Sequence, residues 1–168
     1  MSSLTTQNKK QFSSKQETTV ADALGWSVVG GSGCRLTEVG DVRSDEWLCE
    51  CKTHTSPNHA IAFNLSVWAK LRNEAAAKFK YPVLIVDDGS QLLSRTWCMF
   101  RLNVFDLVKD NIAVVGLPIN RNININFKYD ELPVEVGTKR RIYTCLYDNV
   151  FVGITAFDTF KSLVTGEA

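Results

Sequence analysis

The sequence contains no long run of hydrophobic residues and no excess of charge of either sign. No stretch approaches the roughly 20 apolar residues that a membrane-spanning helix needs, and the polar start MSSLTTQNKKQFSSKQ lacks the apolar segment of a signal peptide. The 19 basic and 18 acidic residues give a formal net charge of +1, so attraction to nucleic acid has to come from local patches. These absences lead us to expect a soluble, cytoplasmic or intracellular protein that does not enter a membrane.

The sequence also lacks any Cys-x-x-Cys motif. Its five cysteines are odd in number and irregularly spaced, which indicates free thiols in a reducing compartment and not a disulfide framework. Cys49 and Cys51 alternate with Glu50, so on a strand both thiols point away from the face of Glu50. Because no second Cys or His pair stands at zinc-finger spacing, we interpret the two as buried structural thiols.

The length predicts a single domain. A chain of 168 residues can bury most of its apolar surface without disulfides or a structural metal. We expect residues 1–11 to form a disordered polar arm and residues 12–168 to fold as one unit. That unit would have its core over residues 12–90 and a C-terminal elaboration over residues 91–168.

A helix is predicted to begin at Ser13 or Ser14. Ser14 and Glu17 fit the S-x-x-E capping box, and the apolar residues between Val20 and Leu24 supply a helical stripe. Gly25 follows at the position where helices commonly end.

Extended segments follow this helix. WSVV, residues 26–29, predicts a short strand, and LTEVGDVRS and EWLCECKTH predict a hairpin that turns near Asp45 and Glu46. Phe63 to Phe79 has helical periodicity. VLIV, residues 83–86, is typical of a strand that is covered on both faces.

Beyond residue 90 the pattern predicts a strand in SRTWCMFRL, a short helix and then a strand in FDLVKDNIAVVGL, a further strand in RRIYTCLYD, and a short helix over residues 156–164. INRNININF alternates strictly and suits a hairpin arm, an edge for dimer pairing or a DNA-contacting flap. The order of elements predicts an α/β or α+β fold with a mixed central β-sheet flanked by helices.

The hairpin carries three ionisable side chains that geometry brings together. If it turns symmetrically about Asp45 and Glu46, Asp41 lies opposite Glu50 with Cβ atoms about 4.5–5.5 Å apart. Two carboxylates at that distance repel unless a cation lies between them, and Mg²⁺ prefers such oxygens. Lys52 shares the face of Glu50. The alternative is a solvated sheet face with alternating charges.

Two more residues are candidates for the same site. Glu17 leans toward the helix stripe that meets the sheet, so it either closes the capping box or serves the site. Ser32 lies in the loop GGSG, whose bare backbone N–H groups could meet a phosphate, although a simple turn residue is the alternative. His54 and His59 could act as a base or as phosphate ligands, but loop histidines beside a proline usually do neither.

Basic residues at two places could hold a nucleic-acid backbone by charge. They are Lys9, Lys10 and Lys15 near the start of the chain and the run Lys139, Arg140 and Arg141 near its end. A run of this kind is otherwise a solvated surface.

In this order, the candidate residues resemble the PD-(D/E)XK nuclease fold, and most of all the archaeal-type Holliday junction resolvases and their viral relatives. The resemblance covers about residues 12–90. It rests on Glu17 in the first helix, Ser32 in a glycine-rich loop, Gly40-Asp41, Glu50-Cys51-Lys52, and a helix with Trp68 and Leu71 that leads into residues 82–86.

The resemblance implies a restriction-endonuclease-like core and a metal-dependent DNA endonuclease. Asp41 and Glu50 would bind Mg²⁺, or Mn²⁺ in its place, and the Cys51 carbonyl would be a further ligand. Glu17 would complete the site directly or through a bound water.

The resemblance also implies roles around the scissile phosphate. Lys52 would orient or activate the attacking water and steady the charge on the phosphate, while Ser32 would contact the phosphate near the cut. Resolvases of this type act as homodimers on branched DNA, and viral members would act inside the host cell.

Two other functions remain open at this stage. The first is a nuclease of the same fold, of restriction, repair or replication type, that acts on linear or single-stranded DNA. The second is a catalytically silent nucleic-acid-binding module whose charges only solvate a sheet face.

Overall fold

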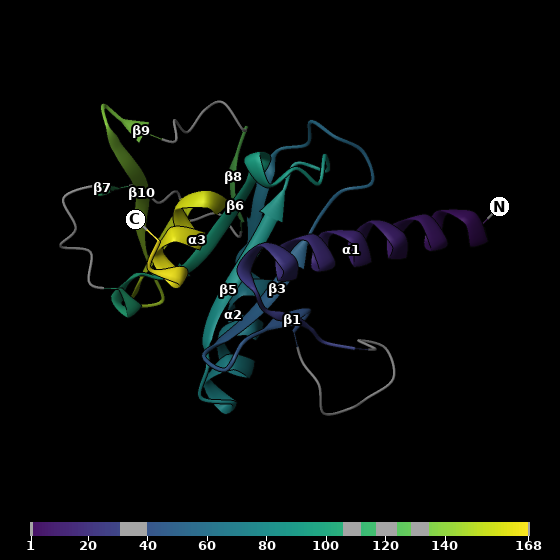
Figure 1. The fold of residues 1–168 in the computed structure, drawn as a ribbon, viewed down its shortest axis with the longest axis horizontal. Helices are drawn as coiled ribbons and strands as arrows, with labels where there is room; N and C mark the ends of the chain where they lie inside the picture. The colour runs from purple at the N-terminus through teal and green to yellow at the C-terminus, as the bar shows by residue number, and fades with distance from the viewer. Residues whose placement is uncertain (1, 31–39, 106–111, 117–123, 129–134, 168) are drawn as a thin grey trace.

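The computed structural model describes residues 2–30, 40–105, 112–116, 124–128 and 135–167 (Figure 1). In this part of the chain the fold is α+β, with three α-helices and a mixed, open β-sheet. The predicted mixed central sheet flanked by helices is therefore present.

The first helix, α1, spans Ser2–Leu24 and begins well before the predicted cap. The predictions of a helix start at Ser13 or Ser14 and of an arm over residues 1–11 therefore differ from the structure, which is helical from residue 2. The stretch contains neither proline nor glycine, so nothing interrupts the helix at Ser13. The Ser13 hydroxyl instead donates to Glu17 Oε1 at 2.8 Å, within the helix. Figure 1 shows the N-terminal half of α1 projecting away from the sheet.

Eight strands follow one another across the main sheet in the order β1-β2-β3-β5-β6-β11-β10-β7, with β9 paired to the start of β10. The pairs β3–β5 and β7–β10 are parallel, and the other neighbours are antiparallel. The strands are β1 (Ser27–Val28), β2 (Val42–Arg43), β3 (Trp47–Lys52), β5 (Tyr81–Asp87), β6 (Thr96–Arg101), β7 (Ile112–Gly116), β9 (Glu135–Val136), β10 (Lys139–Tyr147) and β11 (Val150–Ala156).

The β2–β3 hairpin has the predicted register. Val42 lies opposite Cys49, so the residue numbers of facing partners sum to 91 as expected. The turn does not have a favoured two-residue sequence, but Lys80 Nζ donates to the carbonyl oxygens of Ser44 and Asp45. This lysine stabilises the turn from outside the hairpin.

The predicted helix over Phe63 to Phe79 is shorter in the structure. β4 (Ile61–Asn64) comes first, and α2 (Leu65–Ala77) follows it. β4 pairs with β8 (Asn124–Phe127) in a separate two-stranded sheet. The described part of INRNININF is thus a strand that pairs with β4 on one side, and none of the other described strands pairs with its second edge.

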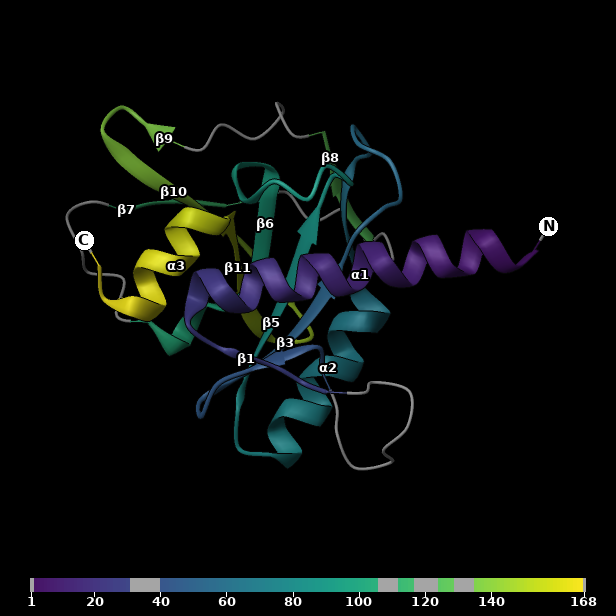
Figure 2. The ribbon, with the colours of Figure 1, turned by 45° about the vertical axis from the view of Figure 1, so that its right-hand side comes forward.

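Two hydrophobic cores lie on the two faces of the main sheet. Along β5, Val83 and Ile85 pack on the face with α1 and α3 (Phe157–Thr165), whereas Leu84 and Val86 pack on the face with α2. The prediction that VLIV is covered on both faces is confirmed. Figure 2 shows α1 crossing the sheet with α3 beside its C-terminal end.

Two short 3₁₀ turns, Leu93–Arg95 and Leu102–Val104, flank β6. Among the described residues, no helix combines the length and the apolar character that crossing a bilayer requires.

The loop over residues 53–60, between β3 and β4, is attached to the end of β5. Thr53 Oγ1 donates to Asp87 Oδ1 at 2.6 Å, and the backbone N–H of His59 donates to the Asp88 carbonyl at 2.9 Å. Asp88 in turn accepts from Arg95 Nε at 2.6 Å. These bonds fix both ends of a loop that leaves directly from Lys52.

Gly89 allows this loop to approach closely. Its φ of +92° lies in the left-handed region, and a Cβ at this position would lie 1.9 Å from the Ser56 carbonyl oxygen. A side chain here would meet backbone that cannot move without displacing the loop.

We predict that Gly89→Ala destabilises the protein by about 2 kcal/mol or more beyond Gly25→Ala. Gly25 has a similar φ of +68° but open space around its Cβ position, so its substitution carries only the backbone strain. Urea unfolding of both variants measures the difference. Equal costs would mean that the loop does not press against Gly89.

Candidate active site

Asp41 lies where the hairpin opens. β2 begins at Val42, and just before it the Asp41 N–H already donates to the Cys49 carbonyl at 2.8 Å. The Asp41 carboxylate then accepts the N–H of Cys51 through Oδ2, also at 2.8 Å. This side chain therefore satisfies a backbone donor of β3 that has lost its strand partner. Gly40, with φ of +81°, gives the chain the bend that precedes it.

Glu50 and Lys52 project from the same face of β3, as predicted. Lys52 Nζ lies 2.5 Å from Glu50 Oε1. The Lys52 side chain is 49% exposed and the Glu50 side chain is 23% exposed. The pair is therefore half-open to solvent and can be reached by a substrate.

Helix α1 contributes two neighbouring residues to this site. Glu17 is half-buried, and its charge acts on Asp41. Gln16 is 3% exposed and donates from Nε2 to the Lys52 carbonyl at 2.9 Å. Because this bond holds the helix against the end of β3, α1 fixes the position of the strand that carries Glu50 and Lys52.

The carboxylates are close enough to repel. Burial and then the charge of Glu50 raise the pKa of Asp41 from 3.8 to about 6, and Glu17 adds to the effect. The Cys51 N–H and the charge of Lys52 act in the opposite direction. A nearby cation would stabilise the charged form of this carboxylate, whose ionisation is disfavoured by burial and by the neighbouring negative charges.

Lys52 carries its full charge. Burial lowers the pKa of its ammonium, but the hydrogen bond and the charge of Glu50 outweigh burial and leave the pKa raised. The structure therefore favours an ammonium over a neutral amine at this position.

The donor set suits a hard divalent cation, which takes carboxylate and carbonyl oxygens. Asp41 and Glu50 offer carboxylates, and Cys51 could contribute its carbonyl oxygen but not its thiol, because the Cys51 side chain is buried in the core. Among the described residues no three His, Cys, Asp or Glu side chains stand ready to hold a metal together. Glu50 accepts a hydrogen bond from Lys52 through Oε1.

The predicted nucleic-acid contacts divide into three groups. Ser32 lies outside the described residues. Two cavities lie along α1, and Lys9 lines one of them while Lys15 lines the other. Lys10 is exposed on the same helix and lines neither cavity.

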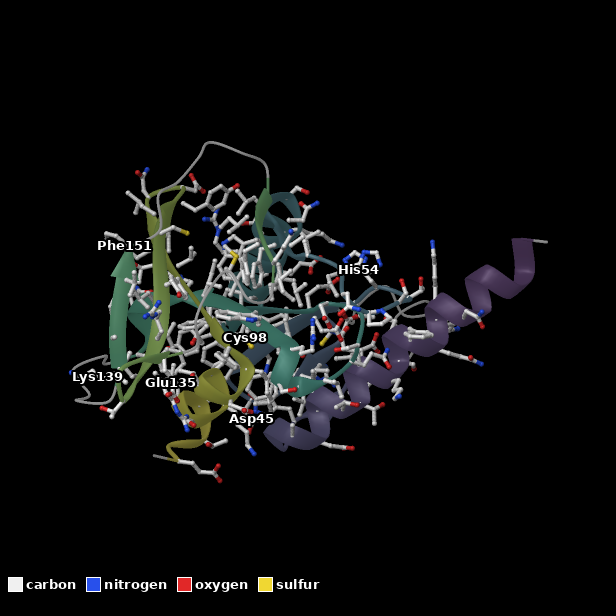
Figure 3. All side chains as sticks on the ribbon, turned by 90° about the horizontal axis from the view of Figure 1, so that it is seen from above. Asp45, His54, Cys98, Glu135, Lys139 and Phe151 are labelled. Carbon is white, nitrogen blue, oxygen red and sulfur yellow. The ribbon has the colours of Figure 1, made fainter. Side chains whose placement is uncertain are left out.

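The basic run near the end of the chain lies elsewhere. Arg140 donates to the Asp158 carbonyl and to Ser162 in α3, and Arg141 donates to the Tyr143 hydroxyl at 3.0 Å. Figure 3 shows Lys139 at the left edge of the molecule, far from His54, the residue two positions after Lys52. The two arginines thus take part in the fold and do not border this site.

The interpretation of the cysteines as structural thiols is supported by their burial. Cys49 and Cys51 are 0% and 3% exposed, their sulfur atoms are 3.6 Å apart, and both are free thiols. Burial raises the pKa of Cys49, which keeps it from acting as a nucleophile or a metal ligand.

Sequence reasoning missed Gln16 and Asp87. Gln16 precedes Glu17 on α1 and gives no signal of its own, because its partner is a distant backbone carbonyl. Asp87 ends the apolar run of β5, and its burial with Oδ2 unpartnered among the described residues follows only from packing.

No protein-family model, curated protein or solved structure matches this chain.

We predict that Asp41→Asn makes the protein more stable than wild type above pH 6 by about 2 to 3 kcal/mol, since one pKa unit corresponds to about 1.4 kcal/mol. The pKa of this group is raised in the folded protein, so its stabilising contribution is complete below about pH 4 and is lost as the pH rises through about 6. Asparagine keeps an oxygen for the Cys51 N–H.

Urea unfolding between pH 4 and pH 8 measures this difference, with the exposed turn variant Asp45→Asn as the control. A wild type that matches Asp41→Asn at every pH would show that Asp41 does not crowd its neighbours.

Proposed function

We propose that this protein is a metal-dependent DNA endonuclease that hydrolyses phosphodiester bonds, with branched DNA such as four-way junctions as its substrate. The observation that carries the proposal is the ion pair of Glu50 and Lys52 on β3 beside the half-buried carboxylate of Asp41, with Glu17 of α1 near enough to act on Asp41 by its charge. Burial first, and then the charge of Glu50, raises the pKa of Asp41. Such a cluster is costly in a protein that makes no use of it.

Asp41 and Glu50 would hold Mg²⁺ or Mn²⁺, together with the Cys51 carbonyl, and Glu17 would complete the site directly or through water. A divalent ion at this position supplies an activated water and neutralises charge on the phosphate. Asp41 is already fixed for this role by its bond to the Cys51 N–H. Glu50, whose Oε1 accepts a hydrogen bond from Lys52, would add its carboxylate to the ion.

Lys52 would act as a fixed positive charge beside the scissile phosphate. Its pKa is raised and not lowered, which supports electrostatic stabilisation of the charge that builds up during hydrolysis over a role as general base. With a cation bound to Glu50, the Lys52 ammonium would remain beside it to face the phosphate.

The arrangement of the core supports the same proposal. Helix α1, the antiparallel strands β1, β2 and β3, the short strand β4, helix α2 and the strand β5, which is parallel to β3, follow one another up to residue 87. Apart from β4, this is the order of elements expected from a restriction-endonuclease-like core. It places Glu50 and Lys52 at the end of β3, where β5 pairs with them on one side and β2 has no residue opposite them.

Cutting two strands of a junction requires two active sites, so we propose that the protein acts as a homodimer. Within the described residues, β7 pairs with β10 alone and Val114 on it is 51% exposed, which leaves one edge of the main sheet open. An open edge can pair with another copy. Light scattering on the full chain measures the state directly.

We predict that the wild type cuts a four-way junction in Mg²⁺ and that Lys52→Ala lowers the rate constant by about 10²- to 10³-fold. Asp41→Ala and Glu50→Ala lose cleavage entirely. The matched control is Lys70→Ala, which removes a lysine ammonium that pairs with Glu74 on α2. Single-turnover cleavage of labelled DNA with Mg²⁺ and with EDTA gives the rates.

The substrates are a junction, a flap, a duplex and a single strand at one fixed salt concentration, because affinity for DNA depends steeply on salt. Preference for the duplex or the single strand would assign the same chemistry to another substrate. No cleavage, and no rise in melting temperature with Mg²⁺, would leave only a binding module. A cation present at 100 times its dissociation constant should stabilise the fold by about 2.7 kcal/mol.

A further inference from the structure

A cavity of about 460 Å³ opens directly beside the candidate active site. Its walls come from α1, from the end of β3 and from the loop over residues 53–60. The residues that give it its chemical character are Lys9, Ser13, Lys52, His54 and His59. Lys52 therefore belongs both to the active site and to this cavity.

The loop that forms the outer wall is held in place. His54 and His59 stack with ring centroids 4.1 Å apart, and His59 Nε2 lies 3.0 Å from Ser56 Oγ. The bonds from Thr53 to Asp87 and from His59 to Asp88 attach the same loop to β5. The two imidazoles are therefore presented on a fixed support.

Four of the side chains that line the cavity carry hydrogen-bond donors that can face a ligand. Lys9 and Lys52 bring ammonium groups, and each imidazole offers a ring N–H. Burial and then His59 lower the pKa of His54 against the opposing charges of Asp87 and Asp88, so His54 serves as a neutral donor. The Ser13 hydroxyl already donates to Glu17. Such a set matches a ligand made of acceptors, and a phosphate group is one.

We infer that this cavity receives a backbone phosphate of the DNA strand, next to the phosphate that is cut. This inference rests on the proposed function and names a second contact of the same substrate. Neighbouring phosphates of one strand are about 3.4 Å apart along the helix axis, so a cavity that shares Lys52 with the active site is within reach of the adjacent phosphate.

The shape of the surface favours a strand over a free ion. A second cavity of about 500 Å³ lies on the other side of Phe12, and Phe12 and Thr55 line both. Lys15 and Gln91 border this second cavity. A continuous chain of phosphates fills two adjoining hollows, whereas a single small anion needs one.

The two histidines permit a direct test, because the chain contains no others and both line this cavity. Their imidazole NMR signals, assigned with His54→Ala and His59→Ala, are followed while the octanucleotide (dT)₈ is added to the full chain in EDTA. Both signals should shift and saturate. Lys9→Ala should weaken this binding by about fivefold, and Lys10→Ala, on the same helix but outside the cavity, should change it by less than about twofold.

Each result supports or overturns the inference. Imidazole signals that stay still while (dT)₈ binds, or equal losses in Lys9→Ala and Lys10→Ala, would overturn it. Saturation by inorganic phosphate but not by (dT)₈ would replace the strand with a free anion. Shifts with (dT)₈ in a protein that never cleaves DNA would keep the subsite and remove the proposed nuclease activity. DNA cleavage by a protein whose imidazole signals do not shift with (dT)₈ would keep the proposed nuclease activity and remove the subsite.

Discussion

The bond between the Asp41 carboxylate and the Cys51 N–H links the fold to the candidate site. Val42 is the first residue of β2, whereas β3 continues to Lys52. The Cys51 N–H on β3 therefore has no backbone partner from β2. Asp41 provides a partner with a side-chain oxygen at 2.8 Å. Because the pairing of β2 with β3 ends there, a carboxylate is held beside Glu50, and because the carboxylate is there, the pairing can end without an unsatisfied donor.

The placement of the Asp41 carboxylate near Glu50 and Glu17 lowers the stability of the folded chain when Asp41 is ionised. Asp41 ionises against burial and against the charges of Glu50 and Glu17, and the Lys52 ammonium offsets only part of that repulsion. A divalent cation would relieve it, so the free energy that the folded chain loses through crowding would return as affinity for the ion.

The sequence was sufficient for the parts of the fold that depend on local pattern. The register of the hairpin, the doubly covered strand over residues 83–86 and the final helix follow from alternation and periodicity, and the convergence of Asp41, Glu50 and Lys52 follows from the register. The start of α1 did not follow, since a capping-box pattern at Ser14 competes with the absence of any helix breaker before it. The contacts of Gln16, Asp87 and the loop histidines could not be predicted, because each depends on segments that are far apart in sequence.

The early start of α1 has a consequence for the surface beside the site. Had the helix begun at Ser14, Lys9 and Phe12 would belong to an unattached segment with no fixed relation to β3. In the structure Gln16 holds the helix to the Lys52 carbonyl, and Gln91 Nε2 donates to the Phe12 carbonyl at 2.6 Å. The helix therefore carries Lys9 to a defined position opposite the histidine loop. A polar segment of the chain is thus held near the sheet by two amide side chains, those of the buried Gln16 and of Gln91.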